Sequence, residues 1–284
     1  MVRGLRRAAL TAVVAFAVTS VAGAAVEVHG SLQEGSFYSS ALKGQVGFEI
    51  YLPPGYKHSG KRYPVVYFLH GLPASSGSFR GAAPFAKALE EVGEAAILVG
   101  PQGARDGDSD PEYIDWGTGR NWETALGTEL PRYVDGHYRT IAGRQGRALV
   151  GLSAGGYGAA LVGLHRLSAF SAIESWSGYF HPTDPTGTKA LDLGSTAANR
   201  HASAHSLVGS LRQTFARRPT FFAFYVGAQD ARFLAENVQL HRELTAAKVP
   251  HVFEIYRGGH SQSLWLGHAT PWLRLALDHL APAR

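Results

Sequence analysis

The chain of 284 residues contains no cysteine and only one methionine. Without cysteine there can be no disulfide bond, thiol nucleophile, zinc–thiolate site or thiol redox chemistry. The fold must therefore be stabilised by its core. Hydrophobic residues make up 45% of the chain and aromatic residues 11%, which is enough for a sizeable core and argues against disorder. The length fits one large domain or two small ones.

Long hydrophobic runs are also scarce. Residues 8–21 are almost wholly apolar, three arginines precede them, and small residues at 22–25 offer cleavage sites. This pattern is typical of a secretory signal peptide, so we assign residues 1–25 to a signal and residues 26–284 to a single domain of a secreted protein, extracellular or in the cell envelope. A transmembrane anchor is the alternative, but the run is shorter than the ~20 residues that a span needs. We expect no integral membrane span after signal removal.

Charged residues make up only 17% of the chain, and its basic character comes partly from the N-terminal segment. The three arginines of residues 1–25 reduce the 27 basic residues to 24, against 22 acidic ones, so the remaining chain has a net charge of +2. No stripe of basic residues indicates a nucleic-acid partner.

Apolar runs of strand length alternate with helical stretches along the chain. Residues 46–52 alternate apolar and polar, as in a half-buried strand, whereas residues 64–70 are apolar throughout, as in a strand buried on both faces. The alternation predicts a mostly parallel sheet with helices on both faces, an α/β fold. Residues 26–44 show no clear period, and residues 178–202 are interpreted as a loop. The other expected strands lie at 95–100, 147–152, 172–176, 220–226 and 251–256, and the expected helices at 82–92, 122–138, 154–166, 204–216, 231–248 and 271–280.

The central motif is the run from Gly151 to Gly155, with Ser153 in its middle. The pattern G-x-S-x-G places a serine on a strained turn between a strand and a helix, with its hydroxyl above the sheet edge. The glycines are needed because side chains there would collide with neighbouring backbone. The motif alone is a weak signal. The strand before it and the helix of small residues after it strengthen the prediction that Ser153 is a catalytic nucleophile.

A serine hydroxyl becomes a good nucleophile when a base takes its proton and an acid orients that base. In α/β-hydrolases the acid follows the serine in the chain and the histidine comes last. Asp230 lies directly after the strand at 220–226, and His260 follows two glycines after the next strand. Ligand sites in this architecture lie at such strand ends, so we predict Asp230 and His260 as the partners of Ser153. Asp230 has an alternative role as a helix cap, and Asp192 is a weaker rival acid in a loop.

The developing oxyanion of acyl transfer needs backbone N–H donors. One comes from the residue after the nucleophile, here Ala154, and the other from the loop after an early strand. We assign the second donor to Leu72, which follows His70 and Gly71. We expect His70 itself to pack at the end of its strand.

Some aromatic residues and one histidine are candidates for substrate contacts. Trp116, Trp122 and His181 lie near predicted strand ends or in long loops. Core packing is the usual role of such aromatic side chains and is the alternative. The same two alternatives, lining a pocket or packing in the core, apply to a larger set of aromatic residues: Phe37, Tyr38, Trp116, Trp122, Trp176 and Tyr179.

An acidic group suggests a calcium loop but fails the EF-hand template. Asp106, Asp108 and Asp110 have the required spacing, yet Pro111 occupies the glycine position and Gly117 the glutamate position. We interpret the segment as a solvated loop and expect neither a metal nor a cofactor in the reaction.

With these features, the chain resembles the esterase D-type esterases of the α/β-hydrolase superfamily. The resemblance rests on the run up to Ser153, the position of Asp230 and the Gly-Gly-His sequence that ends at His260. Within that group the chain is similar to secreted actinobacterial esterases and to mycolyltransferases over residues 45–280. This implies an α/β-hydrolase fold and ester chemistry. The narrower likeness rests on Asp115-Trp116, Trp122-Glu123-Thr124 and Glu129-Leu130-Pro131.

Three departures separate the chain from the mycolyltransferases. His70 stands where these enzymes usually have an acidic residue, Asp230 stands where they usually use glutamate, and the run after Ser153 is richer in glycine. The departures favour a serine carboxylic-ester hydrolase that acts on a small-molecule, lipid or sugar ester. One alternative is an acyltransferase that moves the acyl group to a sugar or lipid hydroxyl. The other is an inactive hydrolase fold used for binding, which predicts that a member of the triad is missing.

Overall fold

The structure, a computed structural model, describes residues 27–106, 113–184 and 189–284. The expected signal at residues 1–25 lies outside these ranges, and so do Asp108 and Asp110 of the acidic group. The third member, Asp106, accepts hydrogen bonds from the backbone N–H of Ser76 at 3.0 Å and from its hydroxyl at 2.8 Å.

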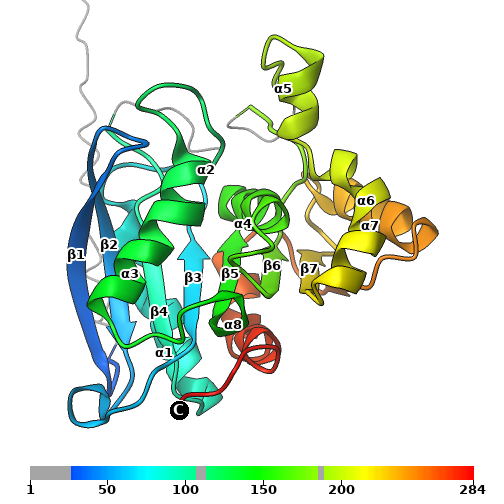
Figure 1. The fold of residues 1–284 in the computed structure, drawn as a ribbon. Coiled ribbons are helices and arrows are strands. Elements are labelled where there is room, and N and C mark those ends of the chain that lie inside the picture. The colour runs from blue at the N-terminus through cyan, green and yellow to red at the C-terminus, as the bar shows by residue number, and fades with distance from the viewer. Residues whose placement is uncertain (1–26, 107–112, 185–188) are drawn as a thin grey trace, which may run out of the picture.

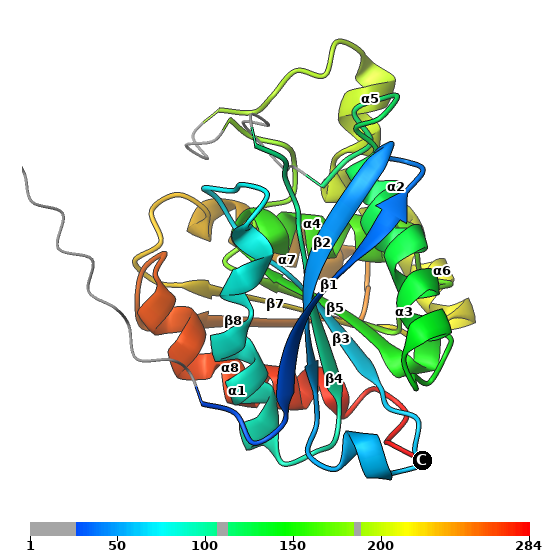
Figure 2. The same cartoon turned by 90° about the vertical axis from the view of Figure 1, so that its left-hand side faces the viewer.

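In the part of the chain that the structure describes, eight strands form one sheet in the order β1-β2-β4-β3-β5-β6-β7-β8 (Figure 1; β8 is labelled in Figure 2). The pairs β1–β2 and β2–β4 are antiparallel, and all other neighbouring strands are parallel. The expectation of a mostly parallel α/β sheet is therefore confirmed. The strands are β1 (Ser31–Ser39), β2 (Gly44–Leu52), β3 (Val65–Leu69), β4 (Ile97–Pro101), β5 (Arg147–Leu152), β6 (Ala172–Trp176), β7 (Phe221–Gly227) and β8 (Val252–Tyr256).

Helices cover both faces of the sheet, as Figure 2 shows. On one face, α1 (Ala83–Val92) and α8 (Gln262–Leu277) bury apolar side chains against the middle strands. On the other face, α3 (Leu130–His137) and α4 (Ala154–His165) do the same. The helices α6 (Val208–Arg217) and α7 (Leu234–Ala246) extend this second layer to β7. The shorter helical segments are η1 (Tyr56–His58), η2 (Ser78–Gly81), α2 (Trp122–Thr124), the π-helical η3 (Ala125–Glu129), η4 (Arg144–Gly146), α5 (Thr196–His201) and η5 (Ala204–Leu207).

One strand and one α-helix were not expected from the sequence. Residues 26–44 contain the edge strand β1, which pairs with β2 along its whole length. Phe37 and Ser39 point to its buried side, but Gly35 interrupts the apolar alternation that would have revealed it. The short helix α5 lies inside the expected loop at 178–202. Ser195 caps α5 by accepting the backbone N–H of Ala198 at 3.1 Å.

The expected position of the last helix was wrong. The sequence suggested a start at Pro271, whereas α8 begins at Gln262 and contains Pro271 in its interior. Ser261 provides the start, because its hydroxyl accepts the backbone N–H of Leu264 at 3.4 Å. The earlier start matters for the site described below, since it places the first turn of α8 next to His260.

Within the ranges described, no helix combines the length and the hydropathy that a membrane crossing requires.

Candidate active site

Ser153 lies on a strained turn between β5 and α4. Its backbone has φ 54° and ψ −121°, a positive-φ conformation that a residue with a side chain adopts at a cost. The turn brings backbone segments very close together. A side-chain carbon on Gly151 would lie 2.1 Å from the carbonyl oxygen of Gly155, so a glycine is required at position 151. The turn and the need for its glycines agree with the expectation from the sequence.

The structure brings Ser153, His260 and Asp230 together in one hydrogen-bonded chain. The Ser153 hydroxyl lies 2.9 Å from Nε2 of His260, and Nδ1 of His260 lies 2.8 Å from Oδ2 of Asp230. With a proton on Nδ1, the imidazole donates to the carboxylate and accepts from the serine hydroxyl. Each of the three follows the C-terminal end of a parallel strand, β5, β7 or β8.

Asp230 is positioned by the start of the segment that leads into α7. Its Oδ1 accepts the backbone N–H groups of Arg232 and Phe233, both at 3.2 Å, while Oδ2 faces His260. The residue is 1% exposed, so its carboxylate is satisfied entirely by these groups. Asp230 thus makes both the cap-like contacts and the contact with histidine. The rival Asp192 is exposed, and its carboxylate accepts hydrogen bonds from the side chain of Asn199 in α5 and from the backbone N–H of Gly194 in its own loop.

Two aromatic residues hold the imidazole of His260, and sequence reasoning missed both. The ring of Phe233 lies edge-on at 5.1 Å and that of Trp265 at 4.9 Å, measured between centroids. The indole N–H of Trp265 donates to the hydroxyl of Ser177 at 3.0 Å, which fixes the tryptophan in place. The contact of Trp265 could not be predicted, because this residue lies in the part of α8 that the sequence did not indicate. Phe233 lies in the expected helix at 231–248, but no local pattern shows that its ring faces His260.

The two predicted oxyanion donors lie on the wall of the cleft that contains Ser153. Ala154 is the first residue of α4, and the first N–H groups of a helix have no acceptor within it. Leu72 lines the same cleft. The peptide before it is close to the nucleophile, since a side-chain carbon on Gly71 would lie 2.9 Å from Cβ of Ser153.

His70 fixes the peptide that carries the Leu72 N–H. Its Nδ1 donates to the carbonyl oxygen of Gly71 at 2.9 Å, and its Nε2 accepts the backbone N–H of Gly103 at 3.0 Å. Burial lowers the pKa of His70, which keeps the ring neutral in this tautomer. Because the Gly71 carbonyl and the Leu72 N–H belong to one planar unit, holding the first orients the second. The expectation that His70 packs at its strand end is confirmed.

The cleft above Ser153 has a volume of about 690 Å³ and adjoins a second chamber of about 320 Å³. Leu72, Pro73, Gln262 and Trp265 line both and form the boundary between them. The second chamber is lined mainly by apolar side chains. They include Phe68, Phe79, Phe85, Leu152 and Leu266. The cleft itself also carries polar residues on its wall, namely Thr183, Asp184, Arg232, Ser261 and Gln262.

The three residues expected to contact substrate do not line this cleft. Trp122 is 2% exposed and belongs to the hydrophobic core, so packing accounts for it. Trp116 is half-buried against the same core, and the guanidinium of Arg120 lies 5.7 Å from its ring. His181 pairs with Glu236 at 2.5 Å instead of facing Ser153. Of the other aromatic candidates, Phe37 and Trp176 are buried in the core and Tyr38 is exposed, whereas Tyr179 is buried and also lines the cleft.

The family model and the relatives that match this chain are all described as esterases. A family model, Esterase, described as "Putative esterase", matches residues 39–271. An esterase of Mycobacterium tuberculosis is 32% identical over 142 residues, which are 50% of this chain and 31% of that protein. An endo-1,4-beta-xylanase/feruloyl esterase of Xylanibacter ruminicola is 29% identical over 151 residues, which are 50% of this chain and 21% of that protein. The chain therefore spans a third or less of the length of these relatives.

Solved structures show the same fold. A ferulic acid esterase superimposes with a TM-score of 0.75 and 23% identity, covering 89% of this chain and all of that one. An S-formylglutathione hydrolase from Agrobacterium tumefaciens gives a TM-score of 0.73 and 22% identity, covering 89% of this chain and 96% of that one. At these identities the likeness supports the α/β-hydrolase fold, which agrees with the mostly parallel sheet.

Proposed function

The chain belongs to the Esterase family, and we propose that it is a carboxylic ester hydrolase with Ser153, His260 and Asp230 as its catalytic triad. The observation that carries the proposal is the pair of hydrogen bonds, 2.9 Å and 2.8 Å, that links the three side chains beside a cleft. In this proposal Ser153 Oγ attacks the ester carbonyl while His260 Nε2 takes its proton. Asp230 holds the tautomer that has a free Nε2 and stabilises the imidazolium that forms.

The negative charge on the carbonyl oxygen is stabilised by two backbone N–H groups, those of Ala154 and Leu72. Donors that are in place before the reaction need no reorganisation, and each contributes roughly 3–4 kcal/mol in known enzymes. The protonated His260 then gives its proton to the leaving alcohol. Water then attacks the acyl carbon while His260 takes its proton, and the bond to Ser153 Oγ breaks as His260 returns a proton to Oγ, which releases the acid.

The division between an apolar chamber and a polar cleft supports one class of substrate. We propose that the acyl group lies in the chamber beside Trp265 and Leu266, and that the alcohol lies toward Thr183 and Arg232. A chamber of about 320 Å³ suits a short acyl chain or an aromatic acid better than a long fatty chain. The substrate is then an ester of such an acid with a polar alcohol.

Acyl transfer is the second outcome that this site supports. The polar wall that receives the leaving alcohol also offers hydrogen bonds to an acceptor alcohol such as a sugar. An acceptor that binds there competes with water for the acyl-enzyme. We expect hydrolysis to dominate. Product analysis after turnover of an ester in the presence of trehalose or glycerol measures how the acyl group is divided between water and the acceptor.

We also propose that the protein is exported and that residues 1–25 are removed. The support is the arrangement of arginines, apolar run and small residues in the sequence. Expression of the full chain in an actinobacterial host tests this. N-terminal sequencing of protein from the culture medium or envelope is expected to give a start near residue 26, whereas an intact N-terminus contradicts cleavage.

Hydrolysis of p-nitrophenyl acetate, butyrate and palmitate tests the proposed enzyme activity. We expect turnover to be highest for the short esters and to be lost in Ser153→Ala. The matched control is Ser168→Ala, because Ser168 is exposed and lies on another part of the surface. Leu266→Trp tests the chamber, since Leu266 is 42% exposed and tolerates a larger side chain. It should reduce the rate with butyrate more than the rate with acetate. Equal activity of Ser153→Ala and the wild type would contradict the proposal.

A further inference from the structure

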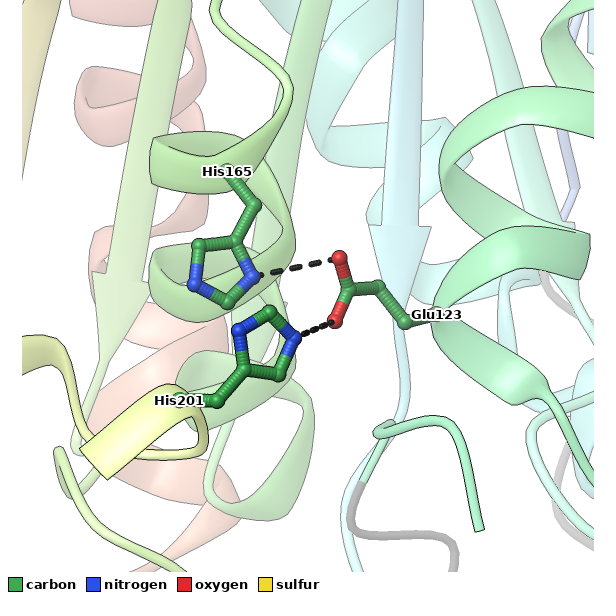
Figure 3. A group of neighbouring side chains, drawn as sticks. All are labelled: Glu123, His165 and His201. Atoms are coloured by element: carbon green, nitrogen blue, oxygen red, sulfur yellow. Dashed lines mark hydrogen bonds and ion pairs between the residues drawn. The ribbon is translucent and has the colours of Figure 1, made fainter. Parts of the chain in front are cut away.

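Two histidines and a glutamate from three separate helices meet outside the active-site cleft (Figure 3). Glu123 comes from α2, His165 from the end of α4 and His201 from the end of α5. His165 Nδ1 lies 3.1 Å from Glu123 Oε1, and His201 Nε2 lies 3.7 Å from Glu123 Oε2. The two imidazoles are stacked, with centroids 4.3 Å apart and planes 15° from parallel.

One carboxylate oxygen of this group is buried and accepts no hydrogen bond from the residues that the structure describes. Glu123 is 2% exposed, and within the described ranges no donor lies at hydrogen-bond distance from its Oε2. The other oxygen, Oε1, faces His165 and also the guanidinium of Arg166, whose nearest nitrogen is 3.5 Å away. Leaving a buried carboxylate oxygen without a hydrogen bond is costly. His201 Nε2, at 3.7 Å, is too far from Oε2 to supply one, whereas a cation between the two atoms would satisfy the oxygen.

The ligand types and their spacing fit a divalent transition-metal ion. Imidazole nitrogens and a carboxylate oxygen are the ligands of many zinc sites, and zinc–ligand distances are 2.0–2.2 Å. Tetrahedral geometry at these distances separates the ligand atoms by about 3.3 Å. The three ligand atoms here lie within 4.8 Å of one another, and the separation of His201 Nε2 from Glu123 Oε2 is already close to the required value. His201 is 64% exposed, which leaves the fourth position open to water.

We propose that Glu123, His165 and His201 bind a divalent zinc-type metal ion that fastens α5 to the body of the enzyme. The helix α5 buries none of its own residues, so it lacks the apolar contacts that hold the other helices. Figure 1 shows it extending from one end of the molecule. It belongs to the long connection between β6 and β7 that also supplies Thr183 and Asp184 to the cleft wall. A metal ion that bridges α5 to α2 and α4 therefore orders this connection.

A second group, His181, His205 and Glu236, offers the same types of ligand, but its polar atoms already have hydrogen-bond partners. Oε1 of Glu236 accepts the backbone N–H of Phe180 at 2.7 Å and faces His181 at 2.5 Å. Nδ1 of His205 faces Glu243 at 2.6 Å. These contacts satisfy the group as a set of hydrogen bonds and ion pairs, and we therefore assign the metal to the first group alone.

Zinc binding by the chelator-treated full chain tests the proposal. The titrant is Zn²⁺ alone, measured by competition with a fluorescent chelator. His201→Ala is the decisive variant, because the side chain is exposed and its loss should not affect folding, which circular dichroism verifies. Glu123→Gln removes the buried ligand. The controls are His58→Ala, an exposed histidine elsewhere, and His181→Ala in the second group.

The wild type, His58→Ala and His181→Ala should each bind one equivalent of zinc with similar affinity. In His201→Ala the affinity should fall about 100-fold or more, since even changes around a metal ligand cost 10–100-fold. Zinc should also slow tryptic cleavage after the exposed Arg200 in the wild type but not in His201→Ala. The proposal is wrong if the wild type binds no zinc, or if folded His201→Ala binds zinc as tightly as the wild type. It is also wrong if His181→Ala is the variant that loses binding.

Discussion

A side-chain carbon on Gly155 would lie 2.0 Å from the backbone carbonyl oxygen of Leu69. Leu69 is the last residue of β3, and Gly155 lies in the first turn of α4. The end of one strand and the helix that follows the nucleophile thus touch backbone to backbone. This contact brings the loop that carries Leu72 next to Ser153, so the oxyanion donors depend on a glycine that takes no part in the chemistry.

Gly155→Ala should therefore destabilise the protein by several kcal/mol or prevent its folding, because neither backbone segment can move away easily. The matched control is Gly209→Ala in α6, where a side-chain carbon would meet no atom of the described residues within 4 Å. Gly209 lies in the first turn of α6, so that change should leave the stability unchanged or raise it by up to about 1 kcal/mol, because alanine favours a helix more than glycine does. Urea unfolding of both variants measures the difference. Equal stabilities of the two variants would show that the close approach is not a constraint.

Asp230→Asn should lower kcat by about 10⁴-fold, as the same change does in serine proteases, because the amide favours the wrong tautomer of the histidine. Asparagine keeps an oxygen for the backbone N–H groups of Arg232 and Phe233, so the fold should survive. Asp192→Asn, in an exposed loop, should leave kcat unchanged. Ester hydrolysis under saturating substrate is the measurement. Loss of activity in the Asp192 variant with activity retained in the Asp230 variant would reassign the acid.

His70→Ala should lower kcat by about 10–100-fold with little change in KM. Removal of one oxyanion donor costs about 10²–10³-fold, and a misoriented donor costs less than an absent one. His70 reaches the reaction only through the Gly71–Leu72 peptide, so ground-state binding should be spared. Steady-state kinetics separate the two parameters, with His58→Ala as control. A rise in KM at constant kcat would instead make His70 a substrate-binding residue.

The buried Glu174 in β6 should make stability depend on pH. Burial raises its pKa to about 8, even though Trp176 Nε1 and the Tyr225 hydroxyl donate to its oxygens at 2.8 and 3.3 Å. The ordinary value is 4.5, so between pH 4.5 and pH 8 the folded chain keeps a proton that the unfolded chain loses. The free energy of unfolding therefore falls as the pH rises through this range and levels off above it.

Glu174→Gln removes this dependence. From pH 4.5 to pH 8, the difference in free energy of unfolding between the variant and the wild type should shift in favour of the variant by on the order of 3–5 kcal/mol. Denaturant unfolding at pH 5 and pH 8 measures the change. The control is Glu94→Gln, an exposed residue whose replacement should leave the slope unchanged. A wild-type slope that persists in Glu174→Gln would mean that other groups cause it.

Much of the site could be predicted because its signals are local. The glycines around Ser153 report a turn, and Asp230 and His260 each follow a strand that the sequence shows clearly. Parallel strands bring such ends to one edge of the sheet, so chain order and strand ends together locate all three. The same reasoning located Leu72 and Ala154 on the cleft wall.

The remaining features depend on contacts between distant parts of the chain. Trp265 reaches His260 because α8 begins at Gln262, and the sequence placed that start at Pro271. Trp122 looked like a pocket residue, but only the packed structure shows that it is core. Glu123, His165 and His201 share no motif, since three helices bring them together. The edge strand β1 is defined by its partner β2 more than by its own pattern.

The central claim is that His260 activates Ser153 as the nucleophile, and covalent labelling with a fluorophosphonate tests it most directly. Intact mass spectrometry should show one adduct on the wild-type protein, and peptide mapping should place it on Ser153. Ser153→Ala should show none, and His260→Gln should label at least about 100-fold more slowly, because general-base catalysis contributes 10²–10⁴-fold. An adduct on another residue, or equal labelling of the wild type and Ser153→Ala, would contradict the account.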